Sequence, residues 1–367
     1  MKNILLVFGT RPEAVKMCPL ALELKKRPSF CVRVLATGQH REMLSSVTEF
    51  FGVVPDYNLG VMAQGQTLYD ITEKILRGTR EVLEKERFDL VLVHGDTTTA
   101  FAAALAAFYA RIPVGHVEAG LRTYDINAPY PEEFNRVAVD ALSAFCFAPT
   151  ERAARALLAE GKVAGRVFVT GNTVIDAFRY TVREDFSHEA LAFAAGRKLI
   201  LITAHRRENL AVMKDIFRGV SRALAKFPDF CAVYPVHPNP AVQSAARTAF
   251  EGSGQVKLIA PLDVFEFHNL LARSHMVLTD SGGVQEEAPH FGVPVLVMRN
   301  TTERREGVDA GTSRLIGTSE ESVYEGICAV LGDGEVYAQM ARAVNPYGDG
   351  HACERIADAV EKIIDKR

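Results

Sequence analysis

The sequence predicts an α/β protein with two Rossmann-like, doubly wound domains, and three observations carry this prediction. Apolar segments of strand length alternate with segments of helical spacing, which is the pattern of a parallel sheet covered by helices. The alternation runs twice, so we expect one domain in residues 1–180 and a second in residues 181–350. The chain of 367 residues is long enough for two domains of ordinary size.

The first series of elements begins at the N-terminus. We expect, in order, a strand, loop and helix in 3–26, a strand in 31–38, helices in 39–52 and 67–86, a strand in 89–96, a helix in 97–112, strands in 113–120 and 144–150, a helix in 151–161 and a strand in 166–172. The Ala-rich segment 97–112 joins two strands as a parallel crossover.

The second series starts near Lys198. We expect strands within 198–209, 231–240, 256–263, 276–283 and 293–300, with helices in 264–274 and 283–291 among the connections. The segment 179–196 between the two series is the expected domain boundary.

Composition and charge exclude several classes of protein. Apolar residues make up 48% and charged residues 24%. With a net charge of −3, the chain lacks the excess of positive charge that is typical of proteins that bind nucleic acid or anionic membranes. The six cysteines are scattered and form no CxxC pair, which is typical of reduced thiols in the cytosol. No segment has the pattern of a signal peptide or the apolar length of a membrane span, so we expect a cytoplasmic location.

Two carboxylates follow neighbouring predicted strands. Asp96 ends the run DLVLVHGD, and Glu118 lies in PVGHVEAG. Residues just past the carboxyl ends of parallel strands face the ligand crevice, so both side chains are candidates for acid–base chemistry. Alternatively, Asp96 is the N-cap of the following helix, or Glu118 is a charge on a surface loop.

The loop after the first strand is a candidate anion site. GTRPEA opens a helix, whose N-terminus favours negative charge, and Arg11 adds a full positive charge. Lys16 lies in the same helix and faces either the ligand or solvent. A structural salt bridge is the alternative role for Arg11.

The segment TDSGGVQEEAP is the strongest candidate for an anion-binding site in the second half of the chain. Ser281, Gly282 and Gly283 let backbone amides approach a phosphate closely. Glu286 and Glu287 follow, and a carboxylate at this spacing suits ribose hydroxyls. A glycine-rich turn without a ligand is the alternative.

Basic side chains follow other strands of the second series. His205, Arg206 and Arg207 lie in TAHRREN, where a cation can neutralise a diphosphate. His237 lies in VHPNP, and either histidine is alternatively a buried core residue. We expect Arg304 or Arg305 to face the ligand and the other to face solvent.

Common catalytic motifs are missing from the sequence. It contains no GxSxG, HExxH or GxxxxGK[ST] pattern and no metal-ligand spacing, so we predict no required metal. The residues alone indicate a two-domain enzyme for a nucleotide diphosphate derivative, with the carboxylates of the first domain at the reacting centre.

A family resemblance adds to this interpretation. The motifs FGTRPEAVKM, QHREML, LVHGDTTTA, PVGHVEAGLRT, PEEFNR, GNTVIDA, HRREN, TDSGGVQEEAP, TTERREG and NPYGDG resemble those of the non-hydrolysing UDP-N-acetylglucosamine 2-epimerases. The resemblance implies the glycosyltransferase-B fold, with the active site in the cleft between the domains and residues 351–367 as a helix that crosses back to the first domain. It implies no cofactor, a UDP-sugar as substrate, a homodimer and a role in cell-surface polysaccharide biosynthesis.

The resemblance also implies a reaction, in which UDP is eliminated from UDP-N-acetylglucosamine and added back through a 2-acetamidoglucal to give UDP-N-acetylmannosamine. Asp96, Glu118 and Glu132 resemble the acid–base carboxylates, and His205 resembles the residue that contacts the diphosphate. The positions that resemble substrate contacts are Arg11, Lys16, Phe267, Ser281, Gly282, Gly283, Glu287 and Arg304. The positions that resemble contacts of an allosteric activator are Gln39, Arg206 and His237.

Three other functions fit parts of the same pattern. A sugar transferase would share the fold, although it needs no base at C2. A hydrolysing epimerase would release free N-acetylmannosamine, and a UDP-sugar sensor would lack turnover. A sugar with an added 3-acetamido group is an alternative substrate.

Overall fold

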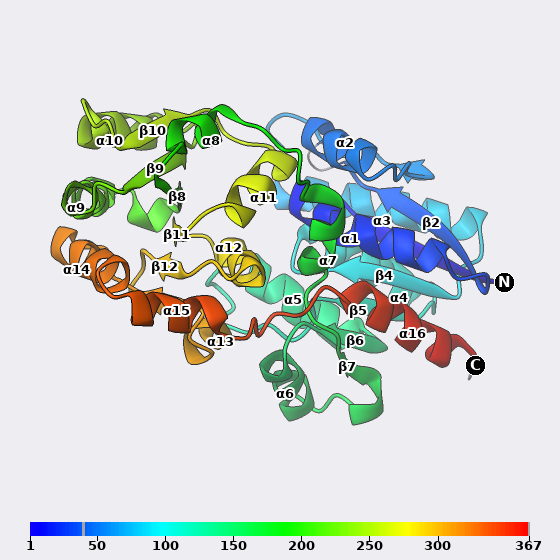
Figure 1. Ribbon diagram of the computed structural model, residues 1–367. Coiled ribbons are helices and arrows are strands. Elements are labelled where there is room, and N and C mark those ends of the chain that lie inside the picture. Colours follow the sequence, from blue (N-terminus) through cyan, green and yellow to red (C-terminus); the bar gives the residue numbers. More distant parts are fainter. Residues whose placement is uncertain (39–40, 366–367) are drawn as a thin grey trace. The chain divides into compact units, whose positions relative to one another are not determined.

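The computed structural model describes residues 1–38 and 41–365 and divides the chain into two compact units (Figure 1). The first unit contains Met1–Ala177 and Gly348–Arg367, and the second contains Phe178–Tyr347. Each unit is built on one parallel sheet, so the prediction of two doubly wound domains is confirmed.

The first unit has a seven-stranded sheet in the order β3-β2-β1-β4-β5-β6-β7. Its strands are β1 (Lys2–Phe8), β2 (Phe30–Ala36), β3 (Tyr57–Asn58), β4 (Leu90–His94), β5 (Val114–Val117), β6 (Phe145–Ala148) and β7 (Val167–Val169). Its helices are α1 (Arg11–Lys25), α2 (Arg41–Phe50), α3 (Leu68–Lys85), α4 (Thr98–Tyr109), α5 (Glu132–Leu142), α6 (Glu151–Ala159), the 3-10 helix η1 (Ala164–Arg166) and α16 (Ala352–Asp365), and α7 (Thr173–Thr181) continues into the second unit.

The second unit has a six-stranded sheet in the order β10-β9-β8-β11-β12-β13. Its strands are β8 (Lys198–Thr203), β9 (Phe230–Pro235), β10 (Val256–Ile259), β11 (Met276–Thr279), β12 (Val295–Val297) and β13 (Ser313–Leu315). Its helices are α8 (Glu189–Ala194), the 3-10 helix η2 (Arg207–Asn209), α9 (Met213–Lys226), α10 (Pro240–Phe250), α11 (Val264–Ala272), α12 (Gly282–Glu287), the 3-10 helix η3 (Ala288–Phe291), α13 (Arg305–Asp309), α14 (Glu320–Leu331) and α15 (Gly334–Arg342).

The central strands β1 and β4 of the first sheet are mostly apolar because helices cover both faces of the sheet. In β1, the residues from Ile4 to Phe8 are fully buried, and in β4 the residues from Leu90 to Val93 are buried as well. Continuous apolar runs of this kind are typical of parallel sheets. The helices that cover them include α4, which buries a row of alanines. Small side chains there let the helix lie close to the sheet.

The strand order of each sheet reverses at one point. In the first sheet the reversal lies between β1 and β4, which are paired directly, and in the second it lies between β8 and β11. Loops at the carboxyl ends of strands diverge at such a point and leave room for a ligand. The strand order therefore marks one candidate binding edge in each unit.

The last helix, α16, packs against α1 of the first unit. Arg27 forms an ion pair of 2.8 Å with Asp358, and the Ser29 hydroxyl donates to Glu361 at 2.7 Å. The carboxylate of Asp176 accepts the backbone N–H groups of Ala352 and Cys353 at 3.1 and 2.9 Å. Asp176 thus caps a helix that is far away in the sequence.

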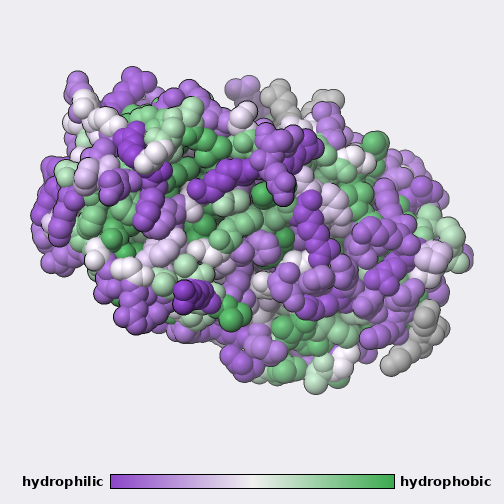
Figure 2. All heavy atoms as spheres, viewed as in Figure 1, coloured by the Kyte–Doolittle hydropathy of each residue, from purple (hydrophilic) through white to green (hydrophobic). Residues whose placement is uncertain are grey.

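Hydrophilic residues cover much of the face shown in Figure 2, with hydrophobic residues between them. Within the described part of the chain, no helix is long and apolar enough to cross a membrane. All six cysteines are free thiols. Burial raises the pKa of Cys18 and Cys146 to about 12, so both are neutral packing groups.

Candidate active site

Asp96 and Glu118 lie at the same edge of the first sheet. β4 and β5 are parallel neighbours, with His94 opposite Val117. Asp96 follows the end of β4 by two residues, and Glu118 follows β5 directly. The sequence prediction that both carboxylates follow adjacent strands is therefore confirmed. The β1–β4 strand reversal lies at the same edge.

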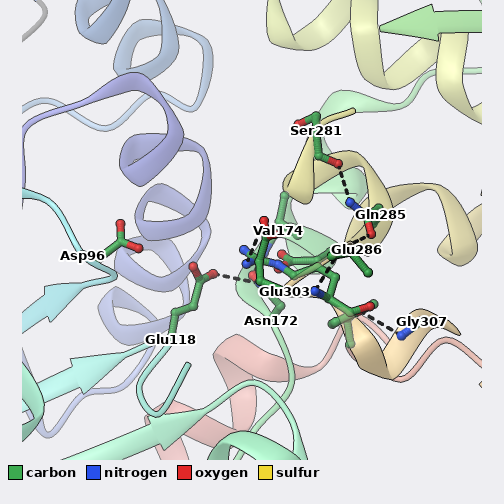
Figure 3. A network of polar contacts seen from close by, with 12 residues as sticks. Asp96, Glu118, Asn172, Val174, Ser281, Gln285, Glu286, Glu303 and Gly307 are labelled. Atoms are coloured by element: carbon green, nitrogen blue, oxygen red, sulfur yellow. Dashed lines mark hydrogen bonds and ion pairs between the residues drawn. The ribbon is translucent and has the colours of Figure 1, made fainter. Parts of the chain in front are cut away.

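Glu118 has an unusual backbone and a mostly buried carboxylate. Its φ angle is +66°, in the left-handed region that side chains other than glycine rarely adopt. Its side chain is 10% exposed and forms an ion pair with Lys16. The Asn172 amide donates to it at 2.8 Å (Figure 3), and the His94 Nε2 atom lies 3.5 Å away. The surface-charge interpretation of Glu118 is therefore wrong.

Asp96 is held by helix α5. Its carboxylate pairs with the guanidinium of Arg136, and its backbone carbonyl accepts the Asn135 amide at 2.9 Å. The N-cap interpretation of Asp96 is wrong, because Thr97 caps α4 through a hydrogen bond to its own side chain from the N–H of Ala100. The Asp96 carboxylate is left one-third exposed, at 32%. It is thus fixed in position and still accessible.

Helix α5 supplies two more acidic groups. Glu132 is its first residue and is partly exposed. Glu133 is buried, and its carboxylate accepts the N–H groups of Thr123 and Tyr124 at 2.9 and 3.0 Å. Glu133 therefore holds the preceding loop, whereas Glu132 is the residue of this pair that a ligand can reach.

The loop after β1 begins α1 with a capping box. The Thr10 side chain accepts the N–H of Glu13, and the Glu13 carboxylate accepts the N–H groups of Gly9 and Thr10. Arg11 is the first residue of the helix and is exposed. Burial raises the pKa of Glu13, while hydrogen bonds from Thr97 and the other donors oppose this.

In the second unit, His205 follows β8 and lies over a buried carboxylate. Asp280, which follows β11, is fully buried and accepts the backbone N–H groups of His205 and Arg206 at 3.0 and 2.9 Å. The His205 Nδ1 atom is 3.5 Å from Asp280. The two loops follow β8 and β11, the strands between which the order of the second sheet reverses. Asp280 therefore fixes His205 at the candidate binding edge.

His205 and His237 stack on each other with 5.8 Å between ring centroids. Both side chains are exposed, so the alternative of buried core histidines is wrong for both. Partial burial lowers the pKa of His205, the charges of His237 and Arg206 lower it further, and Asp280 opposes this. His205 is therefore mainly neutral at pH 7 and can accept or donate a proton.

Ser281, Gly282 and Gly283 form the start of α12, at the end of β11. The Ser281 carbonyl accepts the Gln285 amide at 3.0 Å (Figure 3), and the Ser281 side chain does not cap the helix. A Cβ atom on Gly282 would lie 2.9 Å from the Glu303 carboxylate, so a larger residue does not fit without a shift.

The other expected substrate contacts surround this helix. Arg304 donates to Glu286 at 2.6 Å and is mostly buried, whereas Arg305 is exposed. Glu287 is partly buried, and its carboxylate lies 3.8 Å from Nε2 of His268. Phe267 lies on α11 and packs partly buried against the core of the unit.

Arg206 belongs to an ionic cluster around Glu303. It contacts this carboxylate at 2.9 Å, and Arg299 contacts it at 2.8 Å. Burial raises the pKa of Glu303, but the charges of the neighbouring arginines outweigh burial and hold the pKa at about 2. His237 accepts the N–H of Asn239 at 3.1 Å. Gln39, the third position expected at an allosteric site, lies outside the described residues.

The sequence did not reveal the residues that hold the predicted site residues in place. Asn172, Asp280 and Glu303 contact predicted site residues, and none was singled out as functional. Asp280 carried a usable signal, because it directly follows a strand within TDSGG. Within residues 1–38 and 41–365, no group of three or more His, Cys, Asp or Glu side chains is placed to hold a metal ion.

Two doubly wound units, with carboxylates at the strand ends of one and basic side chains at the strand ends of the other, define an enzyme of the glycosyltransferase-B fold type. The family model described as UDP-N-acetylglucosamine 2-epimerase matches residues 22–361. The chain belongs to this family.

Individual relatives agree with this assignment. UDP-N-acetylglucosamine 2-epimerase of Bacillus subtilis is 52% identical over 357 residues, which are 97% of this chain and 94% of the relative. A crystal structure from Listeria monocytogenes is 48% identical, covers 100% of this chain and 98% of that chain, and has a TM-score of 0.95. UDP-GlcNAc 2-epimerase from Neisseria meningitidis, in a crystal structure bound to UDP-GlcNAc, is 44% identical over 98% of this chain and 100% of that chain, with a TM-score of 0.90.

Proposed function

We propose that the protein interconverts UDP-N-acetylglucosamine and UDP-N-acetylmannosamine without hydrolysing either. The proposal rests on membership of the epimerase family and on the substrate in the Neisseria structure. The observation that carries it is the pair of carboxylates, Asp96 and Glu118, at the carboxyl ends of adjacent strands, each with its own cation.

The proposed reaction is an elimination followed by an addition. The C2 proton of the sugar is a weak acid, so its removal is coupled to the departure of UDP. A base takes the C2 proton, the C1–O bond breaks, and its electron pair leaves with UDP. The product is 2-acetamidoglucal, which has a double bond between C1 and C2. An acid then protonates C2 from the opposite face, and UDP adds back to C1.

We assign the proton transfers to Asp96, Glu118 and Glu132. Proton transfer on opposite faces of C2 needs one base and one acid in each direction, and the three carboxylates include enough groups for both. Glu118 pairs with Lys16 and Asp96 pairs with Arg136, so each carboxylate is held in place by a cation. The left-handed backbone of Glu118 supports this role, since such strain concentrates at functional sites.

We assign the binding of UDP to the second unit, with help from the loop after β1. His205 would contact the diphosphate and assist its departure. The backbone at Ser281, Gly282 and Gly283 can approach phosphate oxygens closely. The remaining proposed contacts are Arg11, Lys16, Arg304, the Glu287 carboxylate for the ribose and Phe267 beside the uracil.

One NMR experiment tests the reaction. The purified protein is incubated with UDP-N-acetylglucosamine in deuterated water, without added metal. UDP-N-acetylmannosamine with deuterium at C2 supports the proposal. Product without deuterium contradicts the elimination, and free N-acetylmannosamine with UDP indicates a hydrolysing enzyme. If only a 3-acetamido sugar gives deuterated product, the reaction stands and the substrate changes.

We also propose that the protein is a cytoplasmic homodimer that supplies cell-surface polysaccharide biosynthesis. Exposed apolar side chains support the dimer, because Phe108 and Tyr109 on α4 and Phe134 on α5 are 53%, 69% and 43% exposed. Light scattering on the purified protein tests the dimer.

For Arg206 and His237 we propose contacts with a second substrate molecule, which would appear as sigmoidal dependence of rate on substrate concentration.

A further inference from the structure

The Glu303 carboxylate lies among three arginines of the second unit, Arg206, Arg299 and Arg304, which we call the arginine cluster. One carboxylate oxygen is 2.9 Å from Arg206 and 3.7 Å from Arg304, and the other is 2.8 Å from Arg299. The Glu303 side chain is 21% exposed, so one side of it reaches solvent. A single carboxylate thus contacts three guanidinium groups.

The oxygen of Glu303 that contacts Arg206 also lies beside the backbone of Gly282. A Cβ atom on Gly282 would be 2.9 Å from this oxygen. The proposed function places phosphate oxygens of UDP beside the same backbone. A phosphate there would lie next to the carboxylate, and two negative charges at such a distance repel each other. The carboxylate and a phosphate group therefore compete for one position.

Each member of the arginine cluster has a second carboxylate partner. Glu208 lies 3.4 Å from Arg206 and 3.3 Å from Arg299. Glu286 accepts a hydrogen bond from Arg304 at 2.6 Å. These contacts hold the arginines whether or not the shared carboxylate is present. Guanidinium groups bind phosphate as well as carboxylate, so the cluster can exchange one anion for the other.

Glu303 is itself an anion at neutral pH. Burial raises its pKa, but the charges of the three arginines outweigh burial and hold the pKa at about 2. Two roles are open to an ionised carboxylate in this place. It can orient the arginines for UDP, or it can occupy the position of a phosphate group. The two roles predict opposite effects on UDP affinity when the charge is removed.

We propose that Glu303 is a displaceable internal anion, whose carboxylate occupies the position of a UDP phosphate group beside Gly282 and leaves the arginine cluster when the diphosphate binds. The solvent-exposed side of Glu303 gives the carboxylate a way out. Binding is then an exchange of one anion for another, so the cluster keeps a negative partner throughout. This inference rests on the proposed binding of UDP by the second unit.

The competition is tested by calorimetry on Glu303→Gln, which keeps the size of the side chain and removes its charge. A position that is already occupied raises the apparent Kd in proportion to its occupancy. We therefore expect the Kd values for UDP and for inorganic pyrophosphate to fall at least about fivefold. The Kd for uridine, which has no phosphate, should change less than twofold. The matched control is Glu321→Gln, at an exposed pair with Arg222 in the same unit, and it should change none of the three.

A second variant, Glu303→Ala, removes the bulk of the side chain together with its charge, and we expect the same direction of change. Near-UV circular dichroism and hydrogen exchange of β11 and β12 show whether each variant is folded, independently of any ligand. In a folded variant, a smaller fall in the Kd for UDP, no change or a rise would overturn the proposal. A rise would assign Glu303 to the orientation of the arginines.

A crystal structure of the wild-type protein with UDP separates displacement from repulsion at a distance. We expect the Glu303 carboxylate to have left Arg299 and a phosphate oxygen to contact the arginine cluster. A carboxylate still paired with Arg299 beside bound UDP would overturn the proposal, even if the affinity of Glu303→Gln rises, and would leave the proposed UDP site intact. If the wild-type protein binds neither UDP nor pyrophosphate, the proposed UDP site fails, and this inference fails with it.

Discussion

The side-chain amide of Asn172 donates a hydrogen bond of 2.8 Å to the carboxylate of Glu118. Its oxygen accepts the N–H of Val174 at 3.1 Å, which fixes the orientation of the amide. The Glu118 carboxylate is thus held in one orientation by a donor that is itself fixed. Asn172 therefore positions Glu118 for the proposed reaction.

Replacement of this donor should slow the reaction. We expect Asn172→Asp to lower kcat by about tenfold or more at pH 7, because a hydrogen bond to a charged group is worth about 1.5–3 kcal/mol and a like charge would replace it. The epimerisation rate measured by NMR tests this. Asn58→Asp is the control, since Asn58 is exposed and its side chain accepts the N–H of Gly60. Equal rates for wild type and Asn172→Asp would contradict the role of Asn172.

Asp96→Asn should abolish turnover and leave UDP binding nearly unchanged. Asparagine keeps the size of the side chain and can still contact Arg136, but it cannot take up a proton at neutral pH. The rate is measured with UDP-N-acetylglucosamine, and the Kd for UDP by calorimetry. Asp215→Asn removes an exposed carboxylate paired with Arg218 and should have no effect. A near-normal rate in Asp96→Asn would remove Asp96 from the proton transfers.

Gly282→Ala should weaken UDP binding. The new Cβ atom would lie 2.9 Å from the Glu303 carboxylate, so either this side chain or the start of α12 must shift. We expect the Kd for UDP to rise about fivefold or more, since a loss of about 1 kcal/mol in binding free energy is roughly fivefold in Kd. Gly334→Ala is the control, because nothing lies within 4 Å of its Cβ position. Unchanged UDP affinity in Gly282→Ala would show that UDP does not approach this backbone.

His237→Ala should raise the pKa of His205. The charge of His237 lowers the pKa of His205, and the stacked ring also shields it from water. Both effects end in the variant. The titration of the His205 ring protons by NMR measures the change, and His351→Ala, at an exposed site in the other unit, should leave it unaltered. A lower pKa for His205 in His237→Ala would contradict the electrostatic account.

The ionic cluster at Glu303 should make stability depend on pH. The pKa of Glu303 is about 2, below its ordinary 4.5, so its contribution is fully present above about pH 4.5 and is lost as the pH falls toward 2. The contribution is at most roughly 3 kcal/mol. In urea unfolding, the deficit of Glu303→Gln should therefore be largest near pH 7 and shrink in acid. Glu321→Gln, at an exposed pair with Arg222, should show a small deficit throughout. A constant deficit for Glu303→Gln would contradict the shifted pKa.

Much of the architecture was predictable because parallel strands are apolar along their length. The runs at β1, β4, β8 and β11 identified strands, and the residues after them identified candidate site groups. The two-residue β3 and the three-residue β13 were missed, since neither lies in an apolar run like those around the equally short β7 and β12. Helix α5 was not identified as a helix, because its first turn follows a proline-rich loop.

The site was predictable only in part, for a physical reason. Asp96 and Glu118 could be paired from strand order, which depends on local patterns. The contacts of Glu118 with Lys16 and Asn172 span 102 and 54 residues, and no local pattern encodes such distances. The left-handed backbone of Glu118 was also beyond prediction, since glutamate seldom adopts it.

The docking of α16 on α1 has a consequence for synthesis on the ribosome. The second unit is continuous in sequence, so it can fold as soon as Tyr347 has left the exit tunnel. The first unit also needs residues after Gly348, and its buried Asp176 lacks the N-terminus of α16 until Ala352 and Cys353 have been made. We therefore expect the part made first to mature last, and premature termination to harm the N-terminal sheet more than the one encoded after it.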